Sequence, residues 1–570
     1  MNLPEEHRKE TYTKIKNVDK GKIAEWLLHY GYYPEQYVLP PCFTIKNFGL
    51  NENRYFEERN NNGNYKVESK KLVKINFPKT DLAEREFAVM HPYHYHDLVW
   101  ELFSNWDDLL EHLFNEDNKI YSYSFPIPIN EETETKKQLR SGRMIYEFLE
   151  MAEKDLVAEA HKYSQIVRLD ITNFYPSVYT HTLCWAWEGR DGKNQGRQKC
   201  SGDQSDKKFG NRLDRLVQYA NDRRTVGIPV GSVISDLMAE MVLTERDINI
   251  SQQLENDKNL KGKFLATRFK DDYRILCKSK SDGKRIIKVI IEVLKEFNLV
   301  VNEKKTEIIE LPDGLYRPHT VFYEPYSFRN PKNLNNDKIH FKSFENVLLR
   351  TLQLHRDYPG TSIIEKFLSE LILSKRTKDR DGQYKVNSVA DRFLLDFGDT
   401  SKATGIKKIK KAVSLLLMLK NESSKSLGKV LSILEHILLF GEIDWFREYV
   451  TIQIKSEIKQ AITKESPFEL NWFLYFICRH NLEIDLRVIY KEMRDDDVHN
   501  KTLGNCGLLE NRFIATLRGK RVGKGFIENP FEEDLNGILL FESPENLIDT
   551  YLIEYLDIFD RDKDSINEEK

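Results

Sequence analysis

Long apolar runs and closely spaced cysteines are both missing from this sequence. Its 570 residues include only 6 cysteines, which lie far apart and form no CxxC pair. This pattern argues against a disulfide framework and against a zinc knuckle. Because no run of about 18 apolar residues occurs, we expect no membrane-spanning helix. The polar N-terminal segment lacks the apolar core of a signal peptide, so we expect a cytoplasmic protein with no membrane partner.

Charge is abundant but unevenly distributed. The chain contains 87 Lys and Arg against 90 Asp and Glu, which gives a net charge of −3. Residues 531–570 hold 13 acidic and 3 basic side chains, so the first 530 residues are net positive by 7. That body can present a basic groove to a nucleic acid. The acidic end is expected to be a solubilising terminus, or alternatively a segment that folds over the groove.

The N-terminal part of the chain mixes helical and strand patterns. Residues 97–114 space their apolar side chains at three and four, which predicts one amphipathic helix. A β-branched run at 166–169 and the segment 269–277 predict two buried strands. The polar, glycine-containing segment 189–210 between them predicts a surface loop.

Beyond about residue 335 the pattern becomes helical. Residues 344–355, 405–420 and 426–440 place Leu, Ile and Val at i, i+3, i+4 and i+7, with Lys and Glu on the other face. We therefore expect a helix-rich C-terminal domain, for which a stack of helical hairpins of HEAT type is a plausible arrangement.

Carboxylates follow the two predicted strands. Asp170 ends the first strand, and Asp271 and Asp272 lie in a tight turn of the second. Hard oxygen ligands of this kind suit Mg²⁺, and two such ions can activate an attacking hydroxyl and stabilise a leaving pyrophosphate. Between these strands, the Gly-Pro-Gly turn of residues 227–232 precedes a predicted helix whose start can approach a nucleotide closely.

Four segments in this order resemble the motifs of reverse transcriptases, specifically the bacterial abortive-infection and defence-associated group. LDITNFYPSVYTHTLCWAW at 169–187 is similar to motif A, and GIPVGSVISDLMAE at 227–240 to motif B. FKDDYRI at 269–275 is similar to motif C, and FNLVVNEKKTEII at 297–309 to motif D. The resemblance implies RNA-directed or template-independent DNA synthesis in antiphage defence.

The resemblance also implies roles for individual residues. Asp170, Asp271 and the backbone carbonyl of Ile171 would hold Mg²⁺, or Mn²⁺ in its place, with Asp272 beside them as a further catalytic carboxylate. Tyr175 falls at the position of the aromatic gate that clashes with a ribose 2′-hydroxyl and so favours deoxynucleotides.

Further substrate-binding residues follow from the same motifs. Gly231 falls at the motif B glycine, near the template base and the incoming nucleotide. Lys305 would lie near the departing pyrophosphate, although Lys304 next to it makes the register ambiguous. Arg140 and Arg143 are expected to clamp the triphosphate, because guanidinium groups match phosphate bidentately.

Three residues depart from the pattern of the family. Phe269 and Lys270 stand where the family has Tyr and a small or apolar residue, and Val230 replaces a common glutamine. Lys270 thus adds a cation next to the expected metal ligands, where it could alter strand grip, fidelity or template use.

The expected architecture is α+β. It comprises an N-terminal extension over 1–80, right-hand fingers and palm of reverse-transcriptase type over 81–330, and an all-α, HEAT-like helical-repeat domain over 331–570. The expected partners are dNTPs and a DNA product strand. The resemblance adds a dedicated non-coding RNA template, a homo-oligomer and a companion defence protein.

Two other functions remain open from the sequence. One is a protein-primed, untemplated terminal transferase that extends one of the 27 tyrosines of this chain. The other is a nucleic-acid-sensing or toxin module whose palm does not polymerise, for which Arg494–His499 (RDDDVH) loosely fits a ribonuclease pattern. His91, His94 and His96 lack a suitable fourth ligand, so we expect them to pack or to stack on nucleic acid rather than to bind zinc.

Overall fold

The computed structural model of the chain describes most of its length. The described residues are 2–34, 37–56, 66–79, 83–127, 145–189, 200, 208–328, 340–372, 374–378, 384–388, 402–440, 443–464, 466–484, 530–531 and 533–544. Among them, no helix is both long enough and apolar enough to cross a membrane.

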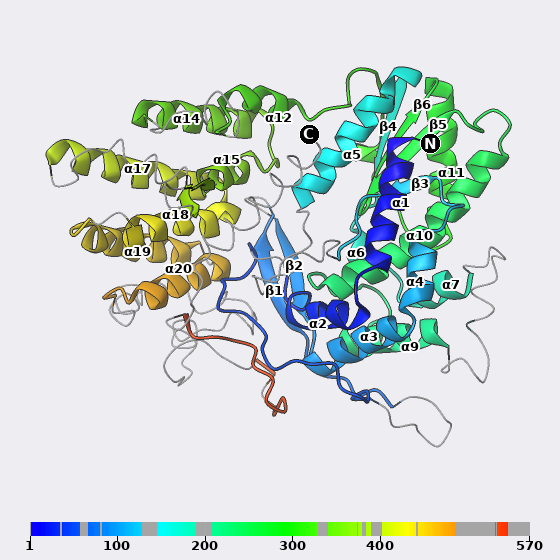
Figure 1. The fold of residues 1–570 in the computed structure, drawn as a ribbon, viewed down its shortest axis with the longest axis horizontal. Coiled ribbons are helices and arrows are strands. Elements are labelled where there is room, and N and C mark those ends of the chain that lie inside the picture. Colours follow the sequence, from blue (N-terminus) through cyan, green and yellow to red (C-terminus); the bar gives the residue numbers. More distant parts are fainter. Residues whose placement is uncertain are drawn as a thin grey trace.

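A five-stranded sheet forms the centre of the larger lobe (Figure 1). Its spatial order is β3-β5-β6-β4-β7, with β3 parallel to β5 and the other neighbours antiparallel. The strands are β3 (Ile120–Ser122), β4 (Gln165–Asp170), β5 (Phe264–Phe269), β6 (Asp272–Cys277) and β7 (Glu307–Glu310). The two predicted strands are therefore confirmed as β4 and the hairpin β5–β6.

Helices pack against this sheet. They are α5 (Ile145–Glu159), α10 (Val233–Asn256) and α11 (Lys280–Lys295). Helix α10 is buried on nearly all sides, and its buried residues include polar and charged side chains as well as apolar ones. Helix α11 instead has a clear apolar stripe through Ile286, Ile290 and Val293, with Lys and Glu facing solvent. The first helix, α1 (Leu3–Lys16), crosses beside α5 and β3.

A second group of elements lies below the sheet in Figure 1. It comprises the antiparallel hairpin of β1 (Val73–Pro78) and β2 (Glu84–Val89) together with α2 (Lys20–His29), α3 (Pro92–Ser104), α4 (Trp106–Leu113), α6 (Phe174–Ser177), α7 (His181–Gly189) and α9 (Phe209–Ala220). The predicted domain boundary at residue 80 falls between β1 and β2, which pair with each other.

The prediction of a single helix over 97–114 is wrong, because two helices occupy this segment. The chain leaves helical geometry at Asn105, with φ −118° and ψ 25°, so that α3 and α4 are separate helices. The Asn105 side chain donates to the Glu101 carbonyl at 3.0 Å and thereby competes with the regular helical bonding. Apolar spacing alone does not reveal such a break.

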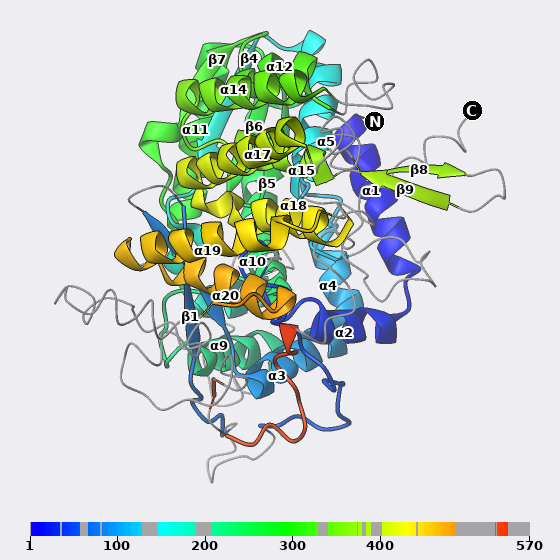
Figure 2. The same cartoon turned by 90° about the vertical axis from the view of Figure 1, so that its left-hand side faces the viewer.

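The C-terminal helices form a stack beside the sheet lobe (Figures 1 and 2). They are α12 (Pro318–Tyr323), α14 (Phe341–Asp357), α15 (Ile363–Ile372), α17 (Ala403–Glu422), α18 (Leu427–Phe440), α19 (Phe446–Thr463) and α20 (Pro467–His480). The three helices predicted here are confirmed as α14, α17 and α18. A HEAT-type repeat stays a prediction, and the boundary at 330 lies outside the described residues.

Smaller elements complete the described chain. Antiparallel β8 (Ser374–Lys378) and β9 (Tyr384–Ser388) form a hairpin. Short 3₁₀ turns are η1 (Ala160–Lys162), η3 (Glu303–Lys305), η4 (Glu324–Tyr326) and η6 (Ser424–Ser426).

Two contacts tie the helical stack together and join it to the sheet lobe. Helix α20 packs on β1, where the rings of Phe77 and Phe468 meet edge to face with centroids 5.2 Å apart. Within the stack, the fully buried Lys420 ammonium pairs with Glu457 at 2.7 Å and with Glu469 at 2.9 Å. Because a buried charge is costly unless it is paired, these carboxylates lock α17 to α19 and α20.

The argument against a disulfide framework needs a correction for two of the cysteines. Cys184 on α7 and Cys200 form a disulfide with Cα atoms 6.2 Å apart. The two cysteines are sixteen positions apart in the sequence, and the absence of a CxxC spacing gave no hint of the pair.

Part of the acidic end packs on the N-terminal region instead of lying in solvent. Leu539 bridges to Lys46, and the Tyr33 hydroxyl donates to the Leu540 carbonyl at 2.7 Å. Glu533 pairs with Lys70 at 3.0 Å and contacts the buried His91 at 2.7 Å. The description of this end as a free solubilising terminus is therefore wrong for its described residues.

A buried carboxyl in α18 makes stability depend on pH. Burial raises the pKa of Glu435 to about 7, although Arg479 and His436 act in the opposite direction. The folded chain thus holds this proton more tightly than the unfolded chain, whose pKa is near 4.5. The resulting stabilisation is complete below the unfolded value and is lost as the pH rises towards about 7. Burial lowers the pKa of neighbouring His480 to about 4, so its contribution to stability changes with pH in the opposite direction.

The change in the free energy of unfolding caused by Glu435→Gln should therefore be more favourable at pH 8 than at pH 5, by about 1–3 kcal/mol. Thermal unfolding at both pH values measures this difference, and His480 titrates in both proteins. Exposed Glu483→Gln serves as the matched control. A shift of equal size at both pH values would show that the Glu435 carboxyl is not responsible.

Candidate active site

Three carboxyl groups meet at one end of the central sheet. Asp170, the last residue of β4, lies directly opposite Asp272, the first residue of β6. Asp271 precedes Asp272 in the β5–β6 turn, and its carbonyl accepts from the Ile171 amide at 3.2 Å. Residues directly opposite in an antiparallel pair present their side chains on the same face. The sheet register therefore brings together carboxylates that are about a hundred residues apart in sequence.

The β5–β6 turn has an unusual backbone. Lys270 has φ +50°, a left-handed conformation that is uncommon for a residue with a side chain. Two polar groups hold it there: the Ser124 hydroxyl accepts from the Lys270 amide at 2.5 Å, and the Arg268 guanidinium donates to the Lys270 carbonyl at 2.8 Å. Hydrogen bonds at both the amide and the carbonyl of Lys270 therefore support the turn that carries Asp271.

Arg268 belongs to a fully buried cluster beneath this turn. Its guanidinium donates to both oxygens of Glu240, at 2.9 and 3.0 Å, and to Asp247 at 2.7 Å. The Tyr273 hydroxyl donates to the other oxygen of Asp247 at 2.8 Å. Although burial acts to lower it, the adjacent carboxylates hold the pKa of Arg268 well above its usual range. These contacts fasten β5 and β6 to α10.

A second polar group joins three elements above the turn. Asp236, in the first turn of α10, accepts from the Tyr175 hydroxyl through Oδ1 and from Lys270 Nζ through Oδ2 at 3.4 Å. Burial, together with Asp236, raises the pKa of the Tyr175 phenol well above its usual range. The phenol therefore stays protonated at neutral pH and acts as the donor.

The turn of residues 227–232 is bonded to several parts of the fold. Ile228 donates to the Tyr175 carbonyl at 3.0 Å, and the Val230 carbonyl accepts from Ala88 of β2 at 2.8 Å. Gly231 has φ +133°, and a Cβ there would lie 2.9 Å from Cγ of Pro34 and 3.3 Å from Cδ1 of Phe87. The glycine is thus required by both its backbone conformation and the close approach of its neighbours.

Gly231→Ala should destabilise the protein by about 1–3 kcal/mol, because the alanine meets both an unfavourable φ and a clash. The matched control is Gly49→Ala, where an added Cβ meets no atom within 4 Å. Thermal unfolding of the two variants measures the difference. Equal melting temperatures for both would contradict the strain at Gly231.

Lys305 from η3 supplies a cation to the carboxylates. Its ammonium contacts Asp170 Oδ2, and this hydrogen bond raises the pKa of Lys305. The fold therefore brings the ammonium group of Lys305 to Asp170.

The carboxyl groups affect one another electrostatically. Burial raises the pKa of Asp271, and Asp170 adds to this effect while Lys270 and Lys305 oppose it. Burial, followed by Asp271 and Asp170, raises the pKa of Asp272 to about 6. Crowded, partly buried carboxylates of this kind favour the approach of a cation.

The donor set fits a hard divalent ion that keeps part of its own shell. Asp170, Asp271 and the Ile171 carbonyl offer oxygen atoms at the end of β4 and in the turn. Within the described ranges, no group of three or more His, Cys, Asp or Glu side chains forms a ready-made metal centre. Such a site suits Mg²⁺, which shares its coordination with water and substrate phosphates.

Some sequence-based predictions do not join this site. Arg140 and Arg143 lie outside the described residues, as does the segment Arg494–His499. The three histidines of α3 and its N-cap are buried: His94 Nε2 bonds the Glu68 carbonyl at 2.8 Å, and His96 Nδ1 bonds Asp97 at 2.9 Å. These contacts agree with the expectation that the histidines pack.

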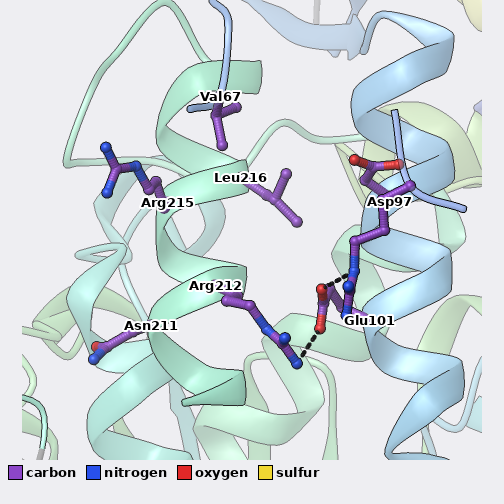
Figure 3. Close-up of a pocket in the computed structure, with 8 residues that line it drawn as sticks. Val67, Asp97, Glu101, Asn211, Arg212, Arg215 and Leu216 are labelled. Atoms are coloured by element: carbon purple, nitrogen blue, oxygen red, sulfur yellow. Dashed lines mark ion pairs between the residues drawn. The ribbon is translucent and has the colours of Figure 1, made fainter. Parts of the chain in front are cut away.

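A separate pocket lies between α3 and α9, and its charged side chains hold these parts of the fold together (Figure 3). Glu101 lies in it between two guanidinium groups, with Arg54 at 2.6 Å and Arg212 at 2.8 Å. These ion pairs join α3 to α9 and to the segment that contains Arg54. None of the predicted site residues lines this pocket.

Sequence reasoning missed the residues that support the site. Glu240 and Asp247 are seven residues apart on α10, so they lie on one face of the helix, and both are buried. Carboxylates in such a setting indicate a buried cationic partner, which here is Arg268. No comparable signal marks Asp236, because an acidic residue in a first helical turn is common.

A family model matches the part of the chain that contains this site. Residues 124–345 match the family model described as reverse transcriptase (RNA-dependent DNA polymerase). Among curated proteins, the chain has no match. Among solved structures, it is similar to apo telomerase from Candida tropicalis, with 11% identity and a TM-score of 0.31 over 71% of this chain and 69% of that chain.

Telomerase from Candida albicans in complex with a TWJ fragment of telomeric RNA is similar at 11% identity and a TM-score of 0.28, over 70% of this chain and 63% of that chain. Both likenesses are too distant to support an argument. The matched segment contains Asp170, Asp271 and Lys305. Residues 124–345 therefore form a reverse-transcriptase domain, and the chain contains a reverse transcriptase-like nucleotidyltransferase domain.

Proposed function

We propose that this chain synthesises DNA by transferring deoxynucleotides to a hydroxyl group, with Asp170 and Asp271 as the essential carboxylates. The observation that carries the proposal is that Asp170 ends β4 beside the β5–β6 turn that holds Asp271, inside the matched domain. Two carboxylates from different strands are the minimum apparatus of two-metal phosphoryl transfer.

In this proposal Asp170, Asp271 and the Ile171 carbonyl hold Mg²⁺, or Mn²⁺ in its place. When bound, such ions activate the attacking hydroxyl and stabilise charge on the leaving pyrophosphate. The Lys305 ammonium contacts Asp170, and it can neutralise or protonate the leaving phosphate. Asp272 adds negative charge beside the metal ligands.

The substrate is expected to approach between α6 and the start of α10. Tyr175 is the proposed gate against the ribose 2′-hydroxyl, and Gly231 permits a close approach of the backbone. Arg140 and Arg143 remain proposed clamps for the triphosphate. The domain description supports an RNA template and a DNA product strand.

The resemblance to defence-associated enzymes extends the proposal to an antiphage role in bacteria. A dedicated non-coding RNA, a homo-oligomer and a companion defence protein belong to this wider proposal. Phage plating on cells that carry the wild-type chain or its Asp271→Asn variant tests the biological role separately from the chemistry.

Incorporation of labelled dNTPs by the purified protein, followed by sequencing of the nucleic acid that it carries, tests the activity. We expect DNA whose sequence matches a co-purifying RNA. A DNase-sensitive adduct on the protein would instead indicate protein priming. Absence of incorporation with both Mg²⁺ and Mn²⁺ would support a sensing module and contradict the proposal.

A further inference from the structure

Asp236 connects the proposed sugar gate to the turn that carries Asp271. Tyr175 follows β4 on the short helix α6, Lys270 lies in the β5–β6 turn, and Asp236 comes from α10. The Tyr175 hydroxyl and the Lys270 ammonium bond different oxygens of the same Asp236 carboxylate. One side chain thus joins all three elements at the point where the nucleotide sugar is expected.

The Tyr175 ring packs partly against the hydrophobic core, with the Phe174 ring edge-on at 5.3 Å, and its hydroxyl is held by Asp236. The backbone anchors of Tyr175 are its carbonyl, which accepts from Ile228 at 3.0 Å, and the left-handed residue Asn173 that precedes α6. Neither anchor holds the far end of the side chain. Since a gate discriminates by the position of its ring edge, the hydroxyl contact to Asp236 determines how firmly that edge is held.

The second oxygen of Asp236 accepts a hydrogen bond from the Lys270 ammonium. The side chains of Lys270 and Asp236 are each about a quarter exposed, with 28% and 26% of their surfaces accessible. The left-handed backbone at Lys270 is fixed by Ser124 and Arg268, so the lysine starts from a rigid position. The cation that departs from the family pattern therefore has a defined partner.

We propose that Asp236 is a positioning residue for nucleotide selection: it holds Tyr175 against the sugar, and Lys270 holds Asp236 in place. The inference rests on the proposed function and adds a residue that governs the preference for deoxyribose. A hydrogen bond to a charged group is commonly worth about one to two powers of ten in an equilibrium.

The test is the ratio of kcat/KM for dGTP to that for GTP, measured with Tyr175→Phe, Asp236→Ala and the double variant. We expect each single change to lower the ratio by about tenfold, and the double variant to be no lower than the single ones. The ratio compares two substrates on one enzyme, so a loss of folded protein does not move it.

Two milder variants separate the two contacts. Asp236→Asn keeps an acceptor for Tyr175 but loses the charge that attracts Lys270, and Lys270→Met loses only the cation. In both variants, the ratio of kcat/KM for dGTP to that for GTP should lie between the values of the wild type and Asp236→Ala. Glu255→Gln is the matched control, because it lies at the other end of α10, roughly 28 Å along the helix.

Unchanged ratios in Tyr175→Phe and Asp236→Ala would overturn the proposal, as would effects that multiply in the double variant. Thermal stabilisation by dGTP and by GTP gives a readout that needs no turnover. If the wild type binds dGTP in preference to GTP but incorporates neither, the proposed function fails while the binding preference still tests Asp236. If neither nucleotide stabilises the wild type, both fail.

Discussion

Asp271→Asn is expected to lower deoxynucleotide incorporation by about 10³-fold or more, while the protein stays folded. The amide keeps the shape of the side chain but removes the charge that would place a divalent ion. Stability should not fall, because burial and the nearby Asp170 already raise the pKa of Asp271. Removing the charge therefore relieves repulsion among the three carboxyl groups.

The experiment compares primer extension and thermal unfolding of Asp271→Asn with those of Asp313→Asn. Asp313 is exposed in the connection between β7 and α12, so the same chemical change there should leave both quantities unaltered. Asp170→Asn should behave like Asp271→Asn. Full activity in either carboxylate variant would overturn the assignment of the essential residues.

Arg268→Met is expected to be the most destabilising of the changes discussed here. It would leave Glu240 and Asp247 buried without their cation, at a cost of about 3–5 kcal/mol. For a domain of this size, such a loss lowers the melting temperature by roughly 6–20 °C. The loss should be smaller at pH 5, because the orphaned carboxylates can then take up protons.

A triple variant provides the control for Arg268. Arg268→Met combined with Glu240→Gln and Asp247→Asn removes all the charges together, and it should recover much of the lost stability. Activity should recover less, because the guanidinium also supports the Lys270 carbonyl in the β5–β6 turn. If Arg268→Met alone melts within 1 or 2 °C of the wild type, the cluster does not hold β5 and β6 to α10.

Local patterns were sufficient to predict many elements. The β-branched run before Asp170 forms β4, and the apolar spacing after residue 335 forms α14, α17 and α18. These segments follow their sequence patterns because the side chains of each element bury one face against a neighbour. Motif order also predicted the reverse-transcriptase domain, which the family model over 124–345 supports. The roles of the individual site residues stay predictions.

Other features depend on contacts between distant segments. A local pattern cannot show that Cys184 meets Cys200 or that Glu533 pairs with Lys70. Each of these depends on where a remote part of the chain lies. Propensity and periodicity contain no information about such positions.

The sequence by itself determined the chemistry available to this protein: carboxylates after two strands, a glycine turn between them and a lysine beyond. Only the tertiary structure decided how these groups are held. The register of β4 against β6 sets Asp170 opposite Asp272, and α10 brings Asp236 to Tyr175 and Lys270. The physical reason is that hydrogen bonds and ion pairs act over a few ångströms, so they form only after packing has placed distant segments side by side.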